Sequence, residues 1–214
     1  MLSKLQKVWR NASTSSDKGH RLDFYSRGLE IFGDTYKGLG WTRQETQSLR
    51  FQLIGSLADY AHKRVLDVGC GFGDFYGFLD PAIHHPLDYV GLDEHPDILA
   101  IAQSRYPTLR FVEGSFLETP FTERFDIGLA SGVFSHRFDS QMATCHAMIK
   151  KLFELSDEMC VFNLLSHHAI HRFDKTFYYY EPKDILDYCL TLTPYVQLHH
   201  HYLRHDFTLA LFRG

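Results

Sequence analysis

The residues best able to do chemistry lie at 65–75, where the sequence is VLDVGCGFGDF. A short apolar run that ends in glycines is typical of a buried strand and a tight turn into a helix. Glycines let the backbone approach a ligand closely, because they lack a Cβ and accept positive φ. Asp93 ends the next apolar run, 20 positions after Gly73, where an acid can hold ribose hydroxyls. Together these features predict a nucleotide-type site; alternatively, the glycines serve only a turn and Asp93 caps a helix.

The spacing of the glycines narrows the class of ligand that this turn can bind. Dinucleotide-binding proteins favour G-x-G-x-x-G, with a pyrophosphate over the N-terminus of the helix. Here the pattern is G-x-G-x-G, and Asp74 follows it directly. An acid in the first turn of the helix would repel a pyrophosphate, but it would tolerate a ligand that carries an ammonium group. We therefore expect a ligand without a phosphate at this turn.

These residues resemble the first motif of class I S-adenosylmethionine (SAM)-dependent methyltransferases. The resemblance continues with YVGLDEHPDIL at 89–99, LRFVEGSFLE at 109–118 and FDIGLASGVFSH at 125–136, so that it covers about 63–165. The stretch GDTYKGLGWTRQETQSLRF at 33–51 is also similar to the lead-in of an uncharacterised bacterial group of small-molecule methyltransferases. The resemblance implies a seven-stranded Rossmann-like sheet with the last strand antiparallel, SAM as the cofactor and S-adenosylhomocysteine (SAH) as the product.

The resemblance also implies cofactor-binding roles for individual residues. The glycine turn would lie under the methionine part of the cofactor, braced by the preceding acid. Asp93 would accept both ribose hydroxyls, and Ser115, where the family often has an acid, would lie by the adenine. The implied set is Asp67, Gly69, Gly71, Gly73, Asp93, Glu94, Ser115, Phe116, Ala130, Ser131 and Gly132. An ordinary structural role is the alternative for each, as for Phe116, which would also suit the core.

Methyl transfer from a sulfonium is a displacement at carbon, so much of the catalysis can come from holding the acceptor in line and excluding water. A general base helps when the acceptor is a hydroxyl or a protonated amine, and histidine titrates near neutral pH. His136, after the fourth predicted strand, is the first catalytic candidate. His167 and His168, after the fifth, are the second. A packed or surface histidine is the alternative for all three.

Other candidates lie outside the glycine motif. Arg50, on the helix before it, could pair with the cofactor carboxylate through a bidentate contact; a surface arginine is the alternative. Tyr25 and Trp41 could cover the pocket from the N-terminal segment. The run Phe177–Tyr180 lies where a lid over the acceptor would sit, and its alternative is a loop packed on the core.

The rest of the chain predicts the elements that must position these residues. Apolar runs predict parallel strands with helices between them, and a tight connection late in the chain predicts an antiparallel hairpin. The expected strands are 65–68, 89–92, 109–112, 125–130, 159–165, 196–202 and 207–212, and the clearest helices are 20–33, 43–61, 140–155 and 182–190. Thr42-Arg43-Gln44-Glu45 has the pattern of a capping box at the start of the second helix.

We therefore expect an α/β fold. It is a Rossmann-like, seven-stranded, mostly parallel sheet with helices on both faces and an antiparallel C-terminal hairpin. A helical N-terminal extension or lid would occupy residues 1–42, and the SAM-binding methyltransferase domain residues 43–214.

The composition of the chain and the absence of certain motifs narrow the class of methyl acceptor. The 214 residues carry 22 Lys+Arg against 26 Asp+Glu, a net charge of −4 that gives no global attraction to nucleic acid. All seven prolines are isolated and none precedes a cysteine, so the motifs of DNA-methylating enzymes are missing. These observations predict SAM-dependent methylation of a small-molecule acceptor. The alternatives are a non-catalytic SAM- or SAH-binding regulatory or partner protein, and an NAD(P)-dependent oxidoreductase.

Three further absences complete the prediction. No apolar run approaches the length of a membrane span, and the start of the chain has no apolar signal region, so we expect a cytoplasmic protein with no membrane partner. The four cysteines have no C-x-x-C spacing. In the run of histidines at 199–201 only His199 and His201 would share a strand face, without a carboxylate cluster, so no metal is expected.

Overall fold

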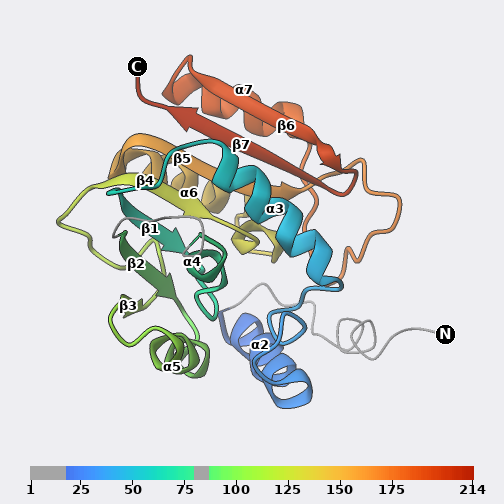
Figure 1. Ribbon diagram of the computed structural model, residues 1–214. Helices are drawn as coiled ribbons and strands as arrows, with labels where there is room; N and C mark the ends of the chain where they lie inside the picture. Colours follow the sequence, from blue (N-terminus) through green and yellow to red (C-terminus); the bar gives the residue numbers. More distant parts are fainter. Residues whose placement is uncertain (1–17, 80–86) are drawn as a thin grey trace.

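Seven strands form one sheet in residues 18–79 and 87–214, the part of the chain that the computed structural model describes. Their order is β3-β2-β1-β4-β5-β7-β6 (Figure 1). Their bounds are β1 (Arg64–Val68), β2 (Asp88–Asp93), β3 (Arg110–Glu113), β4 (Phe125–Ala130), β5 (Ser156–Leu165), β6 (Val196–Leu203) and β7 (Asp206–Phe212). Strands β1 to β5 are parallel to one another, whereas β7 is antiparallel to both β5 and β6. The predicted fold class and its C-terminal hairpin are confirmed.

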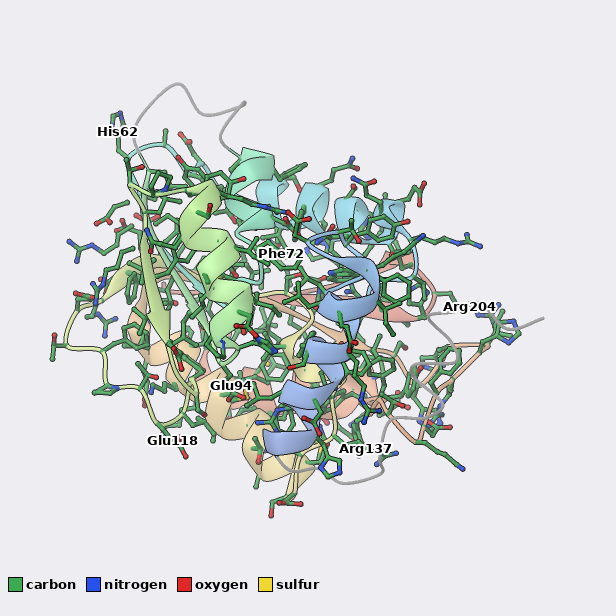
Figure 2. The ribbon with its side chains drawn as sticks, turned by 90° about the horizontal axis from the view of Figure 1, so that it is seen from below. His62, Phe72, Glu94, Glu118, Arg137 and Arg204 are labelled. Carbon is green, nitrogen blue, oxygen red and sulfur yellow. The ribbon has the colours of Figure 1, made fainter. Side chains whose placement is uncertain are left out.

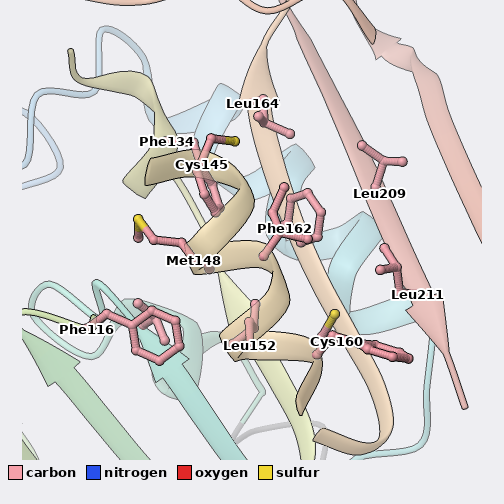
Figure 3. Close-up of a cluster of buried hydrophobic side chains, with 14 of the residues drawn as sticks. Phe116, Phe134, Cys145, Met148, Leu152, Cys160, Phe162, Leu164, Leu209 and Leu211 are labelled. Atoms are coloured by element: carbon pink, nitrogen blue, oxygen red, sulfur yellow. The ribbon is translucent and has the colours of Figure 1, made fainter. Parts of the chain in front are cut away.

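Alternation along the strands divides the core into two layers, because successive side chains point to opposite faces of a sheet. Leu66 and Val68 of β1 belong to one buried cluster, and Val65 belongs to the other. Two helices, α6 (Gln141–Leu155) and α7 (Pro182–Leu192), cover the first face. Figure 3 shows side chains of α6 packed against those of β5 and β7. Since both faces of the central strands are buried, their sequences are continuous apolar runs.

The opposite face is covered by α3 (Gln44–Ser56), α4 (Asp74–Leu79) and α5 (Pro96–Arg105). The structure corrects two details of the predicted α3. Its N-cap is Arg43 and no side chain caps it, so the predicted capping box does not form. The helix also ends at Ser56 rather than near 61, because Tyr60 folds back and its hydroxyl donates to the Ile54 carbonyl at 3.0 Å. That bond satisfies a backbone acceptor at the end of the helix.

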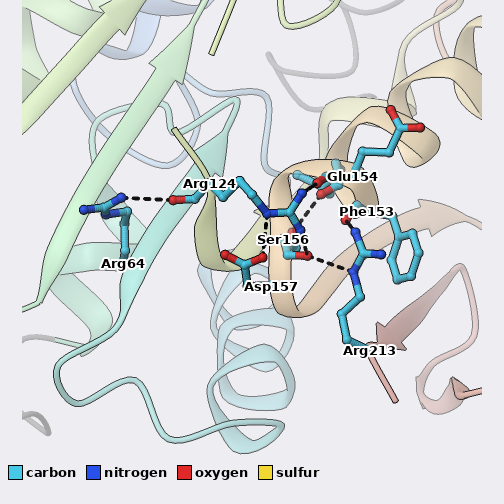
Figure 4. A network of polar contacts seen from close by, with 8 residues as sticks. Arg64, Arg124, Phe153, Glu154, Ser156, Asp157 and Arg213 are labelled. Carbon is cyan, nitrogen blue, oxygen red and sulfur yellow. Dashed lines mark hydrogen bonds and ion pairs between the residues drawn. The ribbon is translucent and has the colours of Figure 1, made fainter. Parts of the chain in front are cut away.

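Arginines connect the end of the sheet where β4 and β5 begin to the C-terminus of α6 (Figure 4). Arg124 donates to the carbonyl of Glu154 at 2.6 Å, and Arg213 donates to those of Phe153 at 2.7 Å and Ser156 at 3.0 Å. Cations at a helix C-terminus satisfy its free carbonyls and oppose its dipole. This network lies at the ends of the strands where β4 and β5 begin, and it serves structure.

The N-terminal helix α2 (Lys18–Phe32) lies at the opposite end, against the carboxyl ends of the parallel strands (Figure 1). It matches the helix expected at 20–33. Residues 1–17 of the predicted extension lie outside the described residues. Figure 2, seen from that end, shows Glu94 beside α2.

Candidate functional site

A cavity of about 420 Å³ opens at the carboxyl ends of β1, β2 and β4. This is where an open α/β sheet places its ligand. Residues from α2, from the loop before α3, and from the segment between β5 and α7 complete its walls. The predicted site residues that line it are Arg50, Asp67, Gly69, Gly71, Asp93, Glu94, Ser115, Phe116, Ser131, Gly132 and His136. The fold thus brings together residues of α3, of β1 and β2, and of the loops that follow β1 to β4.

The glycine turn is held by its own hydrogen bonds. The amides of Gly69 and Cys70 both donate to the Leu92 carbonyl, at 2.7 and 3.0 Å. The Gly71 amide donates to Asp93 at 3.0 Å, and the Gly73 amide donates to the Cys70 carbonyl at 3.0 Å. A phosphate-binding turn instead presents free amides to its ligand. These four amides are already engaged, so the turn offers a close apolar approach rather than a phosphate cradle.

Close packing explains two of the glycines. Gly69 has a φ of +71°, and a Cβ there would lie 2.4 Å from a Val133 methyl, which leaves no room for a side chain. Gly73 does not line the cavity: a Cβ at this position would lie 2.9 Å from the Tyr106 ring. Its role is to let α5 and the end of the turn pack together. Ala130 is buried at the end of β4 and also does not line the cavity. The structure therefore does not place these two residues at the cavity wall.

Asp93 connects the turn to the next strand. One carboxylate oxygen accepts the Gly71 amide and the other accepts the His95 amide, both at 3.0 Å. Each oxygen keeps a further lone pair for a ligand hydroxyl. Burial raises the pKa of Asp93, although the two backbone amides oppose this shift. The side chain is therefore fixed in place before any ligand binds.

Asp67 is an almost fully buried acid next to the last residue of β1. The Tyr89 hydroxyl donates to it at 2.6 Å, and its carboxylate faces the cavity. Burial raises its pKa to about 7, because the loss of solvation outweighs the bond from Tyr89. Asp67 is thus poised to ionise in the neutral range.

The bend that follows β4 is held by a residue outside the predicted set. Asn163 of β5 is buried, and its side-chain oxygen accepts the Gly132 amide at 2.8 Å, while its nitrogen donates to the Ser131 hydroxyl at 3.3 Å. It holds the bend after β4 against the cavity. In the sequence, Asn163 stands out as a lone amide side chain within the apolar run 159–165. A buried polar group needs a hydrogen-bond partner, so such a residue indicates a specific contact.

Asp74 and Gln47 were also left out of the predicted set, although both line the cavity. Gln47 donates to one oxygen of Asp74 at 3.0 Å, and Arg105 donates to the other at 3.1 Å. Burial raises the pKa of Asp74 despite these two contacts. The acid lies at the cavity wall, at the start of α4, where the sequence pattern predicts that a ligand with an ammonium group is tolerated.

His136 lies at the other end of the cavity, in a ring of aromatic side chains. Its Nε2 is 3.0 Å from the Tyr25 hydroxyl of α2. The rings of Phe24 and Phe177 pack edge-on against it at 4.9 and 5.4 Å. Burial lowers the pKa of His136 to about 3, with a smaller contribution from the positive charge of Arg21. The imidazole is therefore neutral at neutral pH.

The structure separates His136 from the other two histidine candidates. His167 and His168 are exposed and do not line the cavity, so the surface alternative holds for both. Alternate residues of 177–180 reach the cavity: Phe177 and Tyr179 line it, whereas Tyr178 and Tyr180 do not. Tyr25 and Trp41 also line it, as expected.

Arg50 is buried, so the surface alternative is wrong. Its guanidinium forms an ion pair with Asp206 of β7 and packs over the Trp41 ring at 4.3 Å. Burial lowers its pKa to about 10, so it stays charged at neutral pH. Its Nε has no hydrogen-bond partner among the described residues, and the side chain lines the cavity. One donor is thus left for a ligand carboxylate.

Helix α2 closes the cavity through contacts at both ends. Arg21 forms an ion pair with Glu94 at 3.2 Å, and the Ser26 hydroxyl lies 2.9 Å from Nε2 of the buried His95. Tyr25 contacts His136 between them. The helix therefore covers the end near Asp93 and the aromatic end together, and residues from α2 must be counted as part of the site.

Comparison with known proteins agrees with this geometry. Residues 65–154 match the family model described as a methyltransferase domain. Over 68 residues the chain is 41% identical to a phthiotriol/phenolphthiotriol dimycocerosates methyltransferase of Mycobacterium leprae. This alignment covers 30% of this chain and 25% of the relative. Over 102 residues it is 31% identical to a demethylmenaquinone methyltransferase of Chlorobaculum tepidum, which covers 48% of this chain and 38% of the relative. The aligned segments thus span well under half the length of these relatives.

A solved structure shares the fold over nearly the whole chain. Magnesium protoporphyrin IX methyltransferase of Synechocystis, with bound SAM, superposes with a TM-score of 0.60 at 14% identity and covers 99% of this chain and 92% of that one. Within the described residues, no helix has the length and apolarity to cross a bilayer. In the same part of the chain, no group of three or more His, Cys, Asp or Glu side chains could hold a metal ion.

Proposed function

We infer that this chain, which belongs to the class I SAM-dependent methyltransferase family, transfers a methyl group from SAM to a small-molecule acceptor and releases SAH. One observation carries this inference: four amides of the glycine turn are already engaged in hydrogen bonds within the protein, and the turn lies beside a fixed Asp93 that can still accept ribose hydroxyls. A nucleoside without phosphates suits such a site. SAM is a nucleoside of this kind.

The charges of the residues that line the cavity also support SAM as the ligand. Four acids line the cavity around the glycine turn, namely Asp67, Asp74, Asp93 and Glu94. SAM carries a sulfonium and an ammonium group, which favour a wall of carboxylates. The dinucleotide of an oxidoreductase carries a pyrophosphate, which the same wall repels. The oxidoreductase alternative is therefore disfavoured on charge as well as on the engaged amides.

The proposed mechanism is a direct displacement at the methyl carbon. The glycine turn and the bend at Ser131 and Gly132 would hold the methionine part, and Asp93 would fix the ribose. Ser115 and Phe116 would border the adenine, and Arg50 would take the cofactor carboxylate. His136 is the proposed catalytic residue, in contact with the acceptor. The cover from α2 would exclude water and align the two reactants.

We propose that residues 1–42 form an N-terminal extension, whose described part contributes residues to the cavity wall, and that residues 43–214 form the methyltransferase domain. A small acceptor fits a cavity of about 420 Å³ better than a duplex or a protein surface does. The names of the two relatives, methyltransferases of a demethylmenaquinone and of phthiotriols, also support an apolar small molecule.

Calorimetric titration of the chain with SAM, SAH and NADH tests the cofactor. We expect SAM and SAH to bind at this cavity and NADH not to bind. Binding of NADH alone would overturn the proposal. The non-catalytic alternative makes a different prediction: it requires SAM to bind while no acceptor in a metabolite panel is methylated.

The pKa of Asp67 predicts how SAM affinity depends on pH. The folded pKa is near 7 and must fall when a cation binds, so below pH 7 binding has to expel a proton from Asp67. We expect SAM affinity to fall by up to about tenfold per pH unit below 7, on top of any titration of SAM itself. The Asp67→Asn variant carries no titrating group here and should lose that component.

Titration calorimetry at pH 6 and 8 measures this difference. Comparing the variant with the natural protein cancels the titration of the ligand. An identical pH dependence in both proteins would show that Asp67 does not interact with the bound cation.

A further inference from the structure

The acceptor end of the cavity holds a histidine without the partner that a general base needs. A catalytic histidine is commonly oriented by a carboxylate, which stabilises the imidazolium as it forms. Among the described residues, the only side chain that hydrogen-bonds to the His136 ring is Tyr25. The nearby Glu94 is occupied by Arg21, and Asp93 accepts two backbone amides.

The surroundings also oppose protonation of His136. The ring is buried among aromatic side chains, and Arg21 places a positive charge nearby. With its pKa lowered to about 3, the imidazole holds a proton far more weakly than a phenolate or an amine, whose conjugate acids have pKa values of about 10. A phenol or an ammonium acceptor would therefore keep its proton in this site.

Hydrogen-bond counting shows what the His136–Tyr25 pair can do instead. A neutral imidazole has one N–H and one lone pair, and the phenol has one O–H. If Tyr25 donates to Nε2, the other ring nitrogen keeps its N–H. If Nε2 donates to the phenol oxygen, Tyr25 keeps its O–H. In either tautomer the pair retains one donor, which suits an acceptor that arrives already ionised.

We propose that the acceptor is an organic carboxylate on an apolar body, which the enzyme converts into its methyl ester, and that the His136–Tyr25 pair binds it as a hydrogen-bond donor. The rings of Phe24, Phe177 and Tyr179 line this end of the cavity and would hold the apolar body. This inference rests on the proposed function, because it names the substrate class of the same site.

The step balances without a base. A carboxylate oxygen attacks the methyl carbon of SAM and forms the O–CH₃ bond of the ester. The C–S bond breaks, and its electron pair stays on sulfur, which becomes the neutral thioether of SAH. The carboxylate loses its negative charge and the sulfonium its positive charge, so no proton is released. A phenol, a thiol or an ammonium acceptor would release one proton for each methyl transferred.

Four candidate acceptors, each with one polar group on an apolar body, test the proposed acceptor class. We would measure SAH formation with 3-phenylpropanoate and decanoate as carboxylates, 4-propylphenol as a phenol and 3-phenylpropylamine as an amine. At least one carboxylate should be methylated at least ten times faster than the phenol and the amine. Faster turnover of the phenol or the amine would overturn the inference, and so would binding of SAM without turnover of either carboxylate. Failure to bind SAM at all would instead overturn the proposed function.

Proton counting gives a second, independent readout. In a weakly buffered solution at about pH 6.5, carboxylates are ionised and the cofactor amino group is protonated before and after the reaction. We expect SAH to form with no matching release of protons. One proton per SAH would contradict a carboxylate acceptor.

Variants of His136 separate a donor from a base. The His136→Asn side chain can donate a hydrogen bond but cannot accept a proton at neutral pH, and His136→Phe can do neither. We expect kcat with the carboxylate to fall less than tenfold in His136→Asn, and KM to rise at least tenfold in His136→Phe. A loss of 10²- to 10⁴-fold in kcat for the asparagine variant, with SAM affinity unchanged, is the mark of a general base and would overturn the inference.

Discussion

Replacing Asp93 with alanine is expected to weaken SAM binding by about 100-fold or more, the largest effect of any single change in the cofactor site. Two ribose hydroxyls would lose a charged acceptor, and hydrogen bonds to charged groups contribute about 1.5–3 kcal/mol each. The Gly71 amide would also lose its acceptor at 3.0 Å, so that the glycine turn would no longer be fixed. Calorimetric titration with SAM measures the loss of affinity.

The Asp93→Asn variant is the matched control, because it has the same shape and keeps one acceptor oxygen. We expect an intermediate loss of affinity in this variant. Circular dichroism must show that both variants fold. If folded Asp93→Ala binds SAM with the affinity of the natural protein, Asp93 does not hold the ribose, and its role is confined to the turn.

The fold could be predicted because its signals are local. The glycine turn at 69–73 marks the passage from a strand into a helix, and the apolar run before it is too short for a helix. The parallel order follows from alternation of strands and helices, since parallel neighbours need a crossover between them. Helix ends were predicted less well. At α3 the buried Tyr60 determines where the helix ends, and nothing in residues 43–61 taken as a local pattern shows that its hydroxyl returns to Ile54.

The site could be predicted only in part, for a similar reason. Asp67 and Asp93 lie within a recognisable motif, whereas the partners of Arg50 and His136 are distant in the sequence. Asp206 begins the last strand, and Tyr25 lies on the first described helix. Gly73 shows the converse case: it belongs to the motif, yet its neighbour Tyr106 makes it a packing residue. Long-range contacts thus decide which motif residues reach the ligand.

Removing the positive charge of Arg50 is expected to cause the largest loss of stability. Arg50 and Asp206 are both buried, and no other cation is ion-paired with Asp206 among the described residues. The Arg50→Met variant would leave a buried carboxylate without its counter-ion, which costs about 3–5 kcal/mol. Urea denaturation should show this as a lower free energy of unfolding with an unchanged m value. Lys183→Met, which breaks the exposed pair with Asp187, is the control and should change stability by less than about 1 kcal/mol.

A double variant separates the structural role of Arg50 from its proposed role in binding. In Arg50→Met/Asp206→Leu no unpaired charge is buried, and Tyr202 still has Thr208 as a hydrogen-bond partner at 2.7 Å. Replacing a buried pair by apolar residues is often neutral, so most of the lost stability should return. SAM affinity should nevertheless stay at least tenfold weaker, because the cofactor carboxylate would still lack its guanidinium. Recovery of affinity along with stability would show that Arg50 serves only the fold, since its missing charge would then matter only through Asp206.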